Sequence, residues 1–177
     1  MANRNLDRVV RPDFLGELSE LRVEQIRQKR QECQQLEDAA SYLRRLIQGR
    51  LDVIGTEIRA RAAGEVADLS TLVEQLPSIL AEHGDRSAFG RMVTTTPGDE
   101  QEAWATARVD AACEGVDIAM TPDLSDQQLY GLTDALSALE REVSIERRKL
   151  HDLIDKLQAE LIRRYKTGEA SVEGLLR

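Results

Sequence analysis

The chain has 177 residues and a formal net charge of −8, with 41% hydrophobic but only 3% aromatic residues. So few aromatic residues do not support a thick globular core, whereas an abundance of Leu, Ala, Glu and Arg is typical of long helices and coiled coils. The acidic balance argues against a generally basic nucleic-acid-binding surface, so we expect no direct DNA binding. It favours a basic protein partner through long-range attraction.

The N-terminus and the cysteines bear on the cellular compartment. The first residues, MANRNLDRVVRPDF, lack the apolar stretch of a signal peptide, and no segment approaches the length of a membrane span. We therefore expect a cytoplasmic protein without a membrane segment, in which Cys33 and Cys113 are reduced. Cys33 falls among apolar residues at helical spacing, which predicts a small buried side chain.

The first predicted elements are a mobile N-terminal tail over 1–18 and a long coiled-coil helix over 19–63. Apolar residues recur in this helix at the spacing of a heptad seam, in which every first and fourth residue faces a partner helix. The seam residues are Ile26, Cys33, Leu36, Ala40, Leu43, Ile47 and Ile54.

The middle of the chain has a looser pattern. The run DLSTLVEQLPSILAEH predicts a short amphipathic helix within 64–84, bent or restarted at Pro77. The stretch that follows is rich in Gly, Thr and charge and predicts a flexible linker over 85–123, although 103–120 is also compatible with a marginal helix. A connection of this length allows a second long helix to return antiparallel to the first.

The second long coiled-coil helix is predicted over 124–166, followed by a C-terminal tail over 167–177. It begins at Ser125 and Gln128, which can cap each other's free backbone donors. Its seam residues are Leu129, Leu132, Leu136, Leu139, Val143, Leu150, Leu153 and Leu157. The predicted fold is therefore all-α: an antiparallel two-helix coiled-coil hairpin with a short extra helix and a flexible loop in the connection.

Both long helices carry the same polar motif, E-x3-S-x2-R-x3-Q/H-x3-D, at a constant offset of 103 residues. At about 100° per residue, its five positions fall within an arc of roughly 80° on one helix face, outside the seam and facing water. A heptad repeat explains recurring apolar residues, but it does not explain matched polar residues outside the seam. The first stripe is Glu37, Ser41, Arg44, Gln48 and Asp52, and the second stripe is Glu140, Ser144, Arg147, His151 and Asp155.

An antiparallel hairpin would bring both stripes to the same side, related by an approximate two-fold axis. Arg50 and Glu146 interrupt the apolar seam, and we expect them either to pair across the hairpin or to extend to water. If they pair, the axis falls between residues 46 and 47 and the stripes overlap laterally.

The side chains of the stripes suit a guanine nucleotide that has its own two-fold symmetry. An arginine fork binds guanine O6 and N7 or clamps phosphate oxygens, and a carboxylate such as Asp52 accepts from guanine N1–H and N2–H. His151 stands where the first stripe has Gln48, and a neutral imidazole offers one donor and one acceptor. Cyclic di-GMP has two guanines and two phosphates, and Arg45 and Arg148 add positive charge nearby.

The doubled motif resembles the signature of the RsiG family, the cyclic di-GMP-dependent anti-sigma factors of filamentous actinobacteria. The tail from Tyr165 to Leu176 is also similar to the C-terminus of that family. The resemblance covers both long helices. It implies that the protein holds the sporulation sigma factor WhiG inactive, with a dimer of cyclic di-GMP bound between the two proteins. It also implies that all ten stripe residues contact the ligand.

Two other classes of function are weaker interpretations of the sequence. An enzyme has little support, because the only histidines are His83 and His151, and the chain has no metal-ligand cluster, phosphate-binding loop or nucleophile motif. An exposed helix flank also cannot exclude water from a reaction. We therefore expect no catalysis. The alternative is a structural coiled-coil adaptor without a nucleotide ligand, in which the stripes are solvated charge and the seam serves dimerisation.

Overall fold

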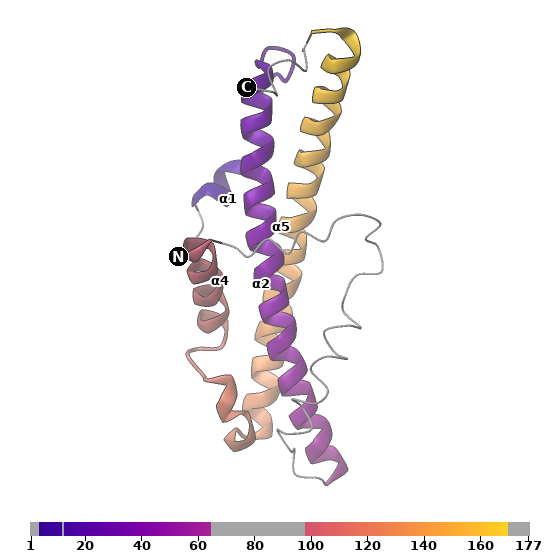
Figure 1. Ribbon diagram of the computed structural model, residues 1–177. Helices are drawn as coiled ribbons and strands as arrows, with labels where there is room; N and C mark the ends of the chain where they lie inside the picture. Colours follow the sequence, from indigo (N-terminus) through magenta and orange to yellow (C-terminus); the bar gives the residue numbers. More distant parts are fainter. Residues whose placement is uncertain (1–3, 12, 65–97, 170–177) are drawn as a thin grey trace.

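A computed structural model describes residues 4–11, 13–64 and 98–169, and every regular element in these ranges is helical. The elements are α1 (Arg4–Val9), α2 (Val23–Ala63), α4 (Asp99–Ala112), the 3₁₀ helix η1 (Ile118–Asp123) and α5 (Asp126–Thr167). Figure 1 shows α2 and α5 side by side, with α1 and α4 along one side of the pair. The described helices include none with an apolar stretch long enough for a bilayer crossing.

The two long helices run in opposite directions. At one end of the pair, Arg27 of α2 donates a hydrogen bond to the Tyr165 hydroxyl of α5. At the other end, Arg61 and Asp126 form an ion pair at 2.8 Å. The start of α2 therefore meets the end of α5, as Figure 1 also shows. This arrangement confirms the predicted antiparallel helical hairpin within one chain.

The seam between α2 and α5 consists of the predicted heptad residues. In α2, the fully buried members are Ile26, Cys33, Ala40, Leu43, Ile47 and Ile54. In α5, they are Leu129, Leu136, Val143, Leu150 and Leu157. Burying one Leu, Ile or Val side chain stabilises a fold by roughly 1.5–3 kcal/mol. The seam therefore gives this chain the apolar core that its few aromatic residues do not provide.

Local residue chemistry sets the ends of both long helices. Gln128 N donates to Ser125 Oγ at 3.3 Å, and Ser125 N donates to Gln128 Oε1 at 2.8 Å, which is the predicted cap at the start of α5. Both helices end at a glycine in the left-handed conformation, Gly64 with φ 73° and Gly168 with φ 76°, where a side chain would add strain. Of the predicted tail over 167–177, residues 170–177 lie outside the described ranges.

The connection between the long helices differs from the flexible linker predicted over 85–123. Its second half contains α4 and η1. Ala105 and Val109 of α4, and Cys113 directly after it, are buried against the hairpin, and Trp104 and Ala112 pack beside them. Apart from Trp104, the side chains of this face are small, so its periodicity in the sequence is weak. Packing on α2 and α5 therefore stabilises α4 more than helix propensity does. The helix predicted over 64–84 lies outside the described residues, except for residue 64.

The N-terminal segment differs from the mobile tail predicted over 1–18. Leu6, Val9 and Phe14 are buried against the end of the hairpin where α2 begins. The buried Arg164 of α5 holds the segment by donating to backbone carbonyls, among them that of Leu18. These two residues are 146 positions apart. No local pattern could therefore indicate that the segment packs on the hairpin.

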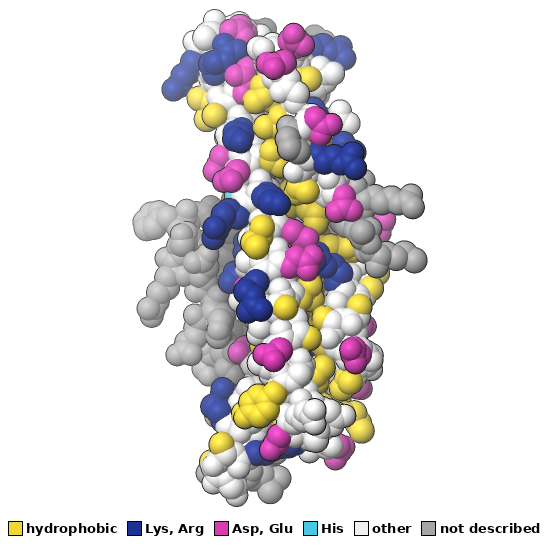
Figure 2. All heavy atoms as spheres, turned by 180° about the vertical axis from the view of Figure 1, so that it is seen from behind, with side chains coloured by type: hydrophobic (Ala, Val, Ile, Leu, Met, Phe, Trp, Pro, Cys, Tyr) yellow, Lys and Arg dark blue, Asp and Glu magenta, His cyan; other side chains and the backbone are white. Residues whose placement is uncertain are grey.

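α4 covers only one flank of the hairpin. Its polar contacts reach residues outside both stripes: Gln101 Nε2 donates to the Gln35 carbonyl at 3.3 Å, and Arg108 pairs with Glu142 at 2.8 Å. Within the described part of the chain, no hydrogen bond or ion pair joins α4 to a stripe residue. Viewed from behind, Figure 2 shows an apolar strip along the molecule with charged side chains on both sides.

Candidate ligand-binding site

The two stripes meet at their N-terminal three residues and form one cluster. This central cluster consists of Glu37, Ser41 and Arg44 from α2, and Glu140, Ser144 and Arg147 from α5. Arg44 Nε lies 2.8 Å from Glu140 Oε1, and Arg147 Nη2 lies 3.0 Å from Glu37 Oε1. The glutamate of each stripe therefore pairs with the arginine of the other stripe.

Each serine of the central cluster orients the glutamate one turn before it. Ser41 Oγ donates to Glu37 Oε1 at 2.6 Å, and Ser144 Oγ donates to Glu140 Oε1 at 3.0 Å. Residues four apart on a helix share a face, so the motif spacing itself places these partners together. The same three roles thus occur twice, which confirms that both stripes lie on one side of the hairpin.

The crossed ion pairs locate the approximate two-fold axis. The paired residue numbers sum to 184 in both cases, so with the offset of 103 the axis passes between residues 40 and 41 of α2. Neither alternative expected for Arg50 and Glu146 is observed, so the axis between residues 46 and 47 that their pairing would imply is wrong. Arg50 pairs with Asp110 at 2.8 Å and Glu146 pairs with Arg108 at 2.9 Å. Both partners belong to α4, which the sequence pattern did not place there.

The C-terminal residues of the stripes extend away from the cluster in opposite directions. Gln48 and Asp52 continue along α2, whereas His151 and Asp155 continue along α5 toward the other end of the hairpin. His151 Nε2 lies 3.3 Å from Glu37 Oε1, and its side chain is half exposed. The side chains of the other three residues make no hydrogen bond or ion pair with any described residue. Within the described residues, their polar groups are therefore not engaged.

The burial of the stripes is uneven, and this corrects the expectation that all stripe residues face water. Glu37 is buried, because it lies beside the seam and is contacted by Arg147 across the hairpin. Glu140 is more exposed, and the hydrogen bond from Arg44 lowers the pKa of its carboxyl below the ordinary value, against a smaller effect of burial. The two halves of the cluster are therefore alike in chemistry but unequal in environment.

The arginines retain donors that the protein does not use. Arg44 contacts Glu140 through Nε, so neither of its terminal nitrogens has a partner among the described residues. Arg147 contacts Glu37 through Nε and Nη2, which leaves Nη1. Arginine forks bind phosphate and guanine through such terminal nitrogens. The cluster can therefore bind an anionic nucleotide without first breaking both ion pairs.

The cysteines have no part in this surface. Cys33 and Cys113 are free and buried. Burial raises the pKa of the Cys33 thiol to about 11, so it is neutral at ordinary pH. Cys33 is thus the small buried seam residue that the sequence predicted. The described residues contain no group of three or more His, Cys, Asp or Glu side chains arranged to hold a metal ion.

Replacing Glu37 by glutamine is expected to cost more stability than the matched change Glu140→Gln. The Glu37 side chain is 9% exposed and contacts four described side chains, whereas that of Glu140 is 24% exposed and contacts two. We expect Glu37→Gln to lower the free energy of unfolding by roughly 1–3 kcal/mol. The loss for Glu140→Gln should stay below about 1 kcal/mol. Urea unfolding at pH 7 measures both, and equal losses would contradict the unequal burial.

The pH dependence of stability provides a second readout for Glu140. Its pKa is lower in the folded state than in the unfolded chain. The stability that it contributes is therefore complete above the ordinary carboxyl pKa of about 4.3, and it is lost as the pH falls through the folded value. We expect Glu140→Gln to lose less stability over this acidic range than the wild type. An unchanged acid dependence would contradict the assignment.

Sequence reasoning overlooked three α2 residues that precede the first stripe, namely Arg27, Arg30 and Gln34. They line a groove beside Asp155. The signal was present, because their spacing continues that of the stripe at steps of three and four residues. It went unnoticed because the second helix has no matching residues, so the repeat did not include them.

A comparison with known families matches most of the chain. A family model described as RsiG-like covers residues 12–80 and 117–177, which are 69 and 61 residues, or 130 of the 177. Both stripes lie within the matched ranges, whereas α4 lies between them. No curated protein matches the chain.

Proposed function

Because the chain belongs to the RsiG-like family, we propose that it is an anti-sigma factor whose complex with its target contains cyclic di-GMP. The family supports the anti-sigma function and a sigma factor as the kind of partner. The finer proposal is that cyclic di-GMP binds the two stripes and that the ligand-bound protein sequesters a WhiG-like sigma factor. Sporulation genes that need this sigma factor would then be repressed.

The approximate two-fold symmetry of the site is the main observation that supports cyclic di-GMP as the ligand. Arg44 and Arg147 occupy equivalent places about an axis across the hairpin, each paired with a glutamate of the opposite helix. Cyclic di-GMP presents two equivalent guanylates about its own axis. A two-fold ligand thus meets an approximately two-fold protein surface, and each contact with the central cluster on one half has a counterpart on the other.

The stripe residues divide into two roles in this proposal. The central cluster supplies two arginine forks for phosphate or guanine, held in place by the glutamates and serines. The outer residues supply hydrogen bonds to base edges: Asp52 and Asp155 accept from guanine N1–H and N2–H, and Gln48 and His151 supply smaller contacts. The proposed ligand residues are therefore the complete set of Glu37, Ser41, Arg44, Gln48, Asp52, Glu140, Ser144, Arg147, His151 and Asp155.

In this function no covalent bond is formed or broken. Cyclic di-GMP is bound and released unchanged, as a dimer held between the two proteins, and the protein is not an enzyme. Sigma factors act on RNA polymerase in the cytoplasm, so the proposal places the chain there as well.

One observation favours the alternative of a coiled-coil adaptor without a ligand. The reciprocal ion pairs satisfy the charges of Glu37, Arg44, Glu140 and Arg147 within the protein. An adaptor would use these pairs only to hold α2 and α5 in register. Titration of the purified protein with cyclic di-GMP, in the absence and presence of the sigma factor, separates the two functions. Absence of binding under both conditions would leave the adaptor.

Asp52→Ala is expected to relax the preference for cyclic di-GMP over cyclic di-AMP. It removes an acceptor matched to guanine N1–H and N2–H, which adenine lacks as a donor pair. The discrimination should fall by roughly 1–3 kcal/mol, the range for a specific base contact. Competition binding with both dinucleotides measures it. Asp152→Ala is the matched control, since this exposed carboxylate lies outside the stripes and should leave the preference unchanged.

A further inference from the structure

The end of the hairpin where α2 begins and α5 ends contains a groove of about 830 Å³, lined by both polar and apolar side chains. This volume lies within the range of roughly 300–1,000 Å³ that is usual for small-molecule sites. Asp155 of the second stripe lines the groove, so the stripe and the groove form one surface. The other polar lining residues used below are Arg27, Arg30 and Gln34 from α2, and Gln158 and Tyr165 from α5.

The α2 wall of the groove continues the first stripe without interruption. Residues three and four apart share one helix face. The steps alternate between three and four along Arg27, Arg30, Gln34, Glu37, Ser41, Arg44 and Gln48. Gln34 Nε2 also donates to Glu37 Oε2 at 3.5 Å, which joins the groove to the central cluster. A ligand on the second stripe can therefore extend into the groove along one flank.

Arg30 is the cation of the groove that is best placed to bind a phosphate. Its guanidinium donates to the Gln158 side chain and forms no ion pair with a carboxylate in the described part of the chain. Arg27 is more engaged, because it lies over the Tyr165 ring, 5.9 Å from the centroid, and donates to the Tyr165 hydroxyl. Tyr165 and Arg27 thus close the far end of the groove, and Arg30 lies between them and Asp155.

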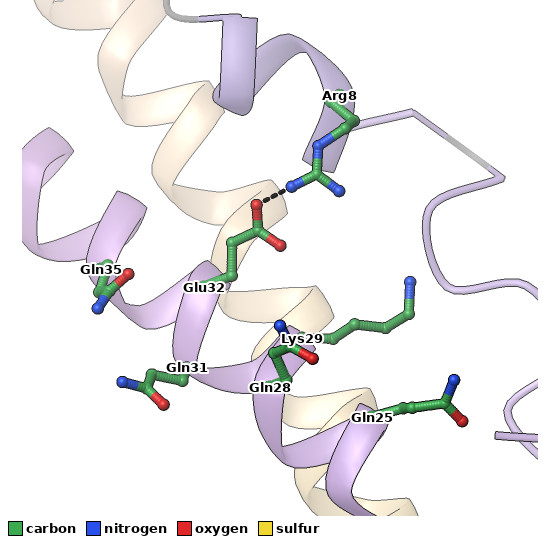
Figure 3. Close-up of a pocket in the computed structure, with 7 residues that line it drawn as sticks. All are labelled: Arg8, Gln25, Gln28, Lys29, Gln31, Glu32 and Gln35. Carbon is green, nitrogen blue, oxygen red and sulfur yellow. Dashed lines mark hydrogen bonds and ion pairs between the residues drawn. The ribbon is translucent and has the colours of Figure 1, made fainter. Parts of the chain in front are cut away.

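A second hollow, of about 620 Å³, lies on the side of α2 that faces α1 (Figure 3). It differs from the groove in the contacts of its basic side chains. Its Arg8 pairs with Glu32, as the dashed line in Figure 3 marks. Its Lys29 donates to the Phe14 carbonyl at 2.6 Å and lies over the Phe14 ring. Both cations therefore already hold the N-terminal segment in place. No stripe residue lines this hollow, and we assign it no ligand.

The opposite end of the hairpin has different side chains at the positions that match the groove. The 103-residue offset matches each groove residue with a position near Asp52, the counterpart of Asp155. Tyr130, Thr133 and Ser137 stand in place of Arg27, Arg30 and Gln34, and Gly55 and Ala62 stand in place of Gln158 and Tyr165. The residue-by-residue match therefore ends with the stripes, and at the other end the basic Arg59 lies beside Gly55 and donates to Thr56 Oγ1.

We propose that this groove binds one guanylate unit of the ligand through Asp155 and Arg30. The inference rests on the cyclic di-GMP binding proposed above. Asp155 accepts from guanine N1–H and N2–H, and Arg30 binds the adjoining phosphate by a charge-assisted contact. Gln34 and Gln158 supply amide groups on the two walls. The ligand therefore meets a site with unequal ends, although its two halves are identical.

Titration of cyclic di-GMP onto the full-length protein with its sigma factor present tests the groove. Arg30→Ala should weaken binding roughly tenfold, the loss expected for one contact to a charged group. Arg30→Lys keeps the charge without the fork and should fall between Arg30→Ala and the wild type. Thr133→Ala is the matched control at the equivalent position of the other end, and its affinity should stay within about twofold of the wild type.

The possible failures are distinguishable. Wild-type affinity in Arg30→Ala, together with clear weakening in Arg44→Ala, would exclude the groove and leave the proposed function intact. Equal weakening in Arg30→Ala and Thr133→Ala would overturn the unequal ends. Absence of binding by the wild type would overturn the proposed function, and the groove assignment with it. Circular dichroism melts check that each variant folds. We expect Arg30→Ala to fold, because Arg30 is exposed and lies outside the seam.

Discussion

Replacing both Arg44 and Arg147 with alanine is expected to reduce the affinity for cyclic di-GMP by at least about thirtyfold. Each fork provides roughly 1–3 kcal/mol as a bidentate guanine contact, so two independent forks provide roughly 2–6 kcal/mol. The loss should lie toward the upper end, because the substitutions also leave Glu37 and Glu140 without their cationic partners. Two unpaired carboxylates would then face the phosphates of the ligand. Isothermal titration with the sigma factor present measures the change.

The neighbouring pair Arg45 and Arg148 provides a closely matched control. Both are exposed, follow the stripe arginines directly and obey the same 103-residue offset. The double variant Arg45→Ala, Arg148→Ala also removes two positive charges from this region. It therefore measures how far binding depends on the general positive potential alone. We expect this control to weaken binding several times less than the stripe double variant. Unchanged binding in the stripe double variant would contradict the site.

The sigma factor is expected to raise the affinity for cyclic di-GMP by about the factor by which the ligand raises the affinity for the sigma factor. This equality follows from linkage, because both factors express one coupling free energy. If the ligand binds mainly to the complex, a concentration about 100 times its Kd for the complex strengthens capture roughly a hundredfold. Titrations with and without the sigma factor give the first factor. Equal affinities in both would exclude a shared ligand.

The physical basis of this coupling lies in the shape and charge of the hairpin. Buried seam residues hold α2 and α5 together along most of their length, so presenting the ligand costs little ordering entropy. The bound phosphates add negative charge to a protein whose net charge is already −8. Basic side chains of a sigma factor would therefore meet a more complementary surface when the ligand is present.

The hairpin was predictable because its determinants are local and periodic. Leu129, Leu136, Val143, Leu150 and Leu157 repeat every seven residues, and each of them is buried. The cap of α5 followed from two residues three positions apart, Ser125 and Gln128. Elements whose stability depends on distant residues were not predictable in this way. The N-terminal segment is held by Arg164 near the other end of the chain, and most apolar residues on the buried face of α4 are small.

The sequence also predicted that the two stripes share one side of the hairpin, but not their pairing. The repeat implied equivalent positions and left the register open. The seam polar residues Arg50 and Glu146 suggested a register that proved wrong, because α4 supplies their partners Asp110 and Arg108. The actual register brings glutamates opposite arginines. Predicting this register would have required the contacts of α4. A repeat between two helices carries no information about a third helix.

The most direct test of the account is capture of a WhiG-like sigma factor on the immobilised full-length protein, with and without cyclic di-GMP. The wild type should retain the sigma factor strongly only when the ligand is present. The variant combining Arg44→Ala and Arg147→Ala should lose that increase, and the Arg45→Ala, Arg148→Ala control should keep most of it. Capture that is equally strong without the ligand, or release of the sigma factor by the ligand, would contradict the proposed switch.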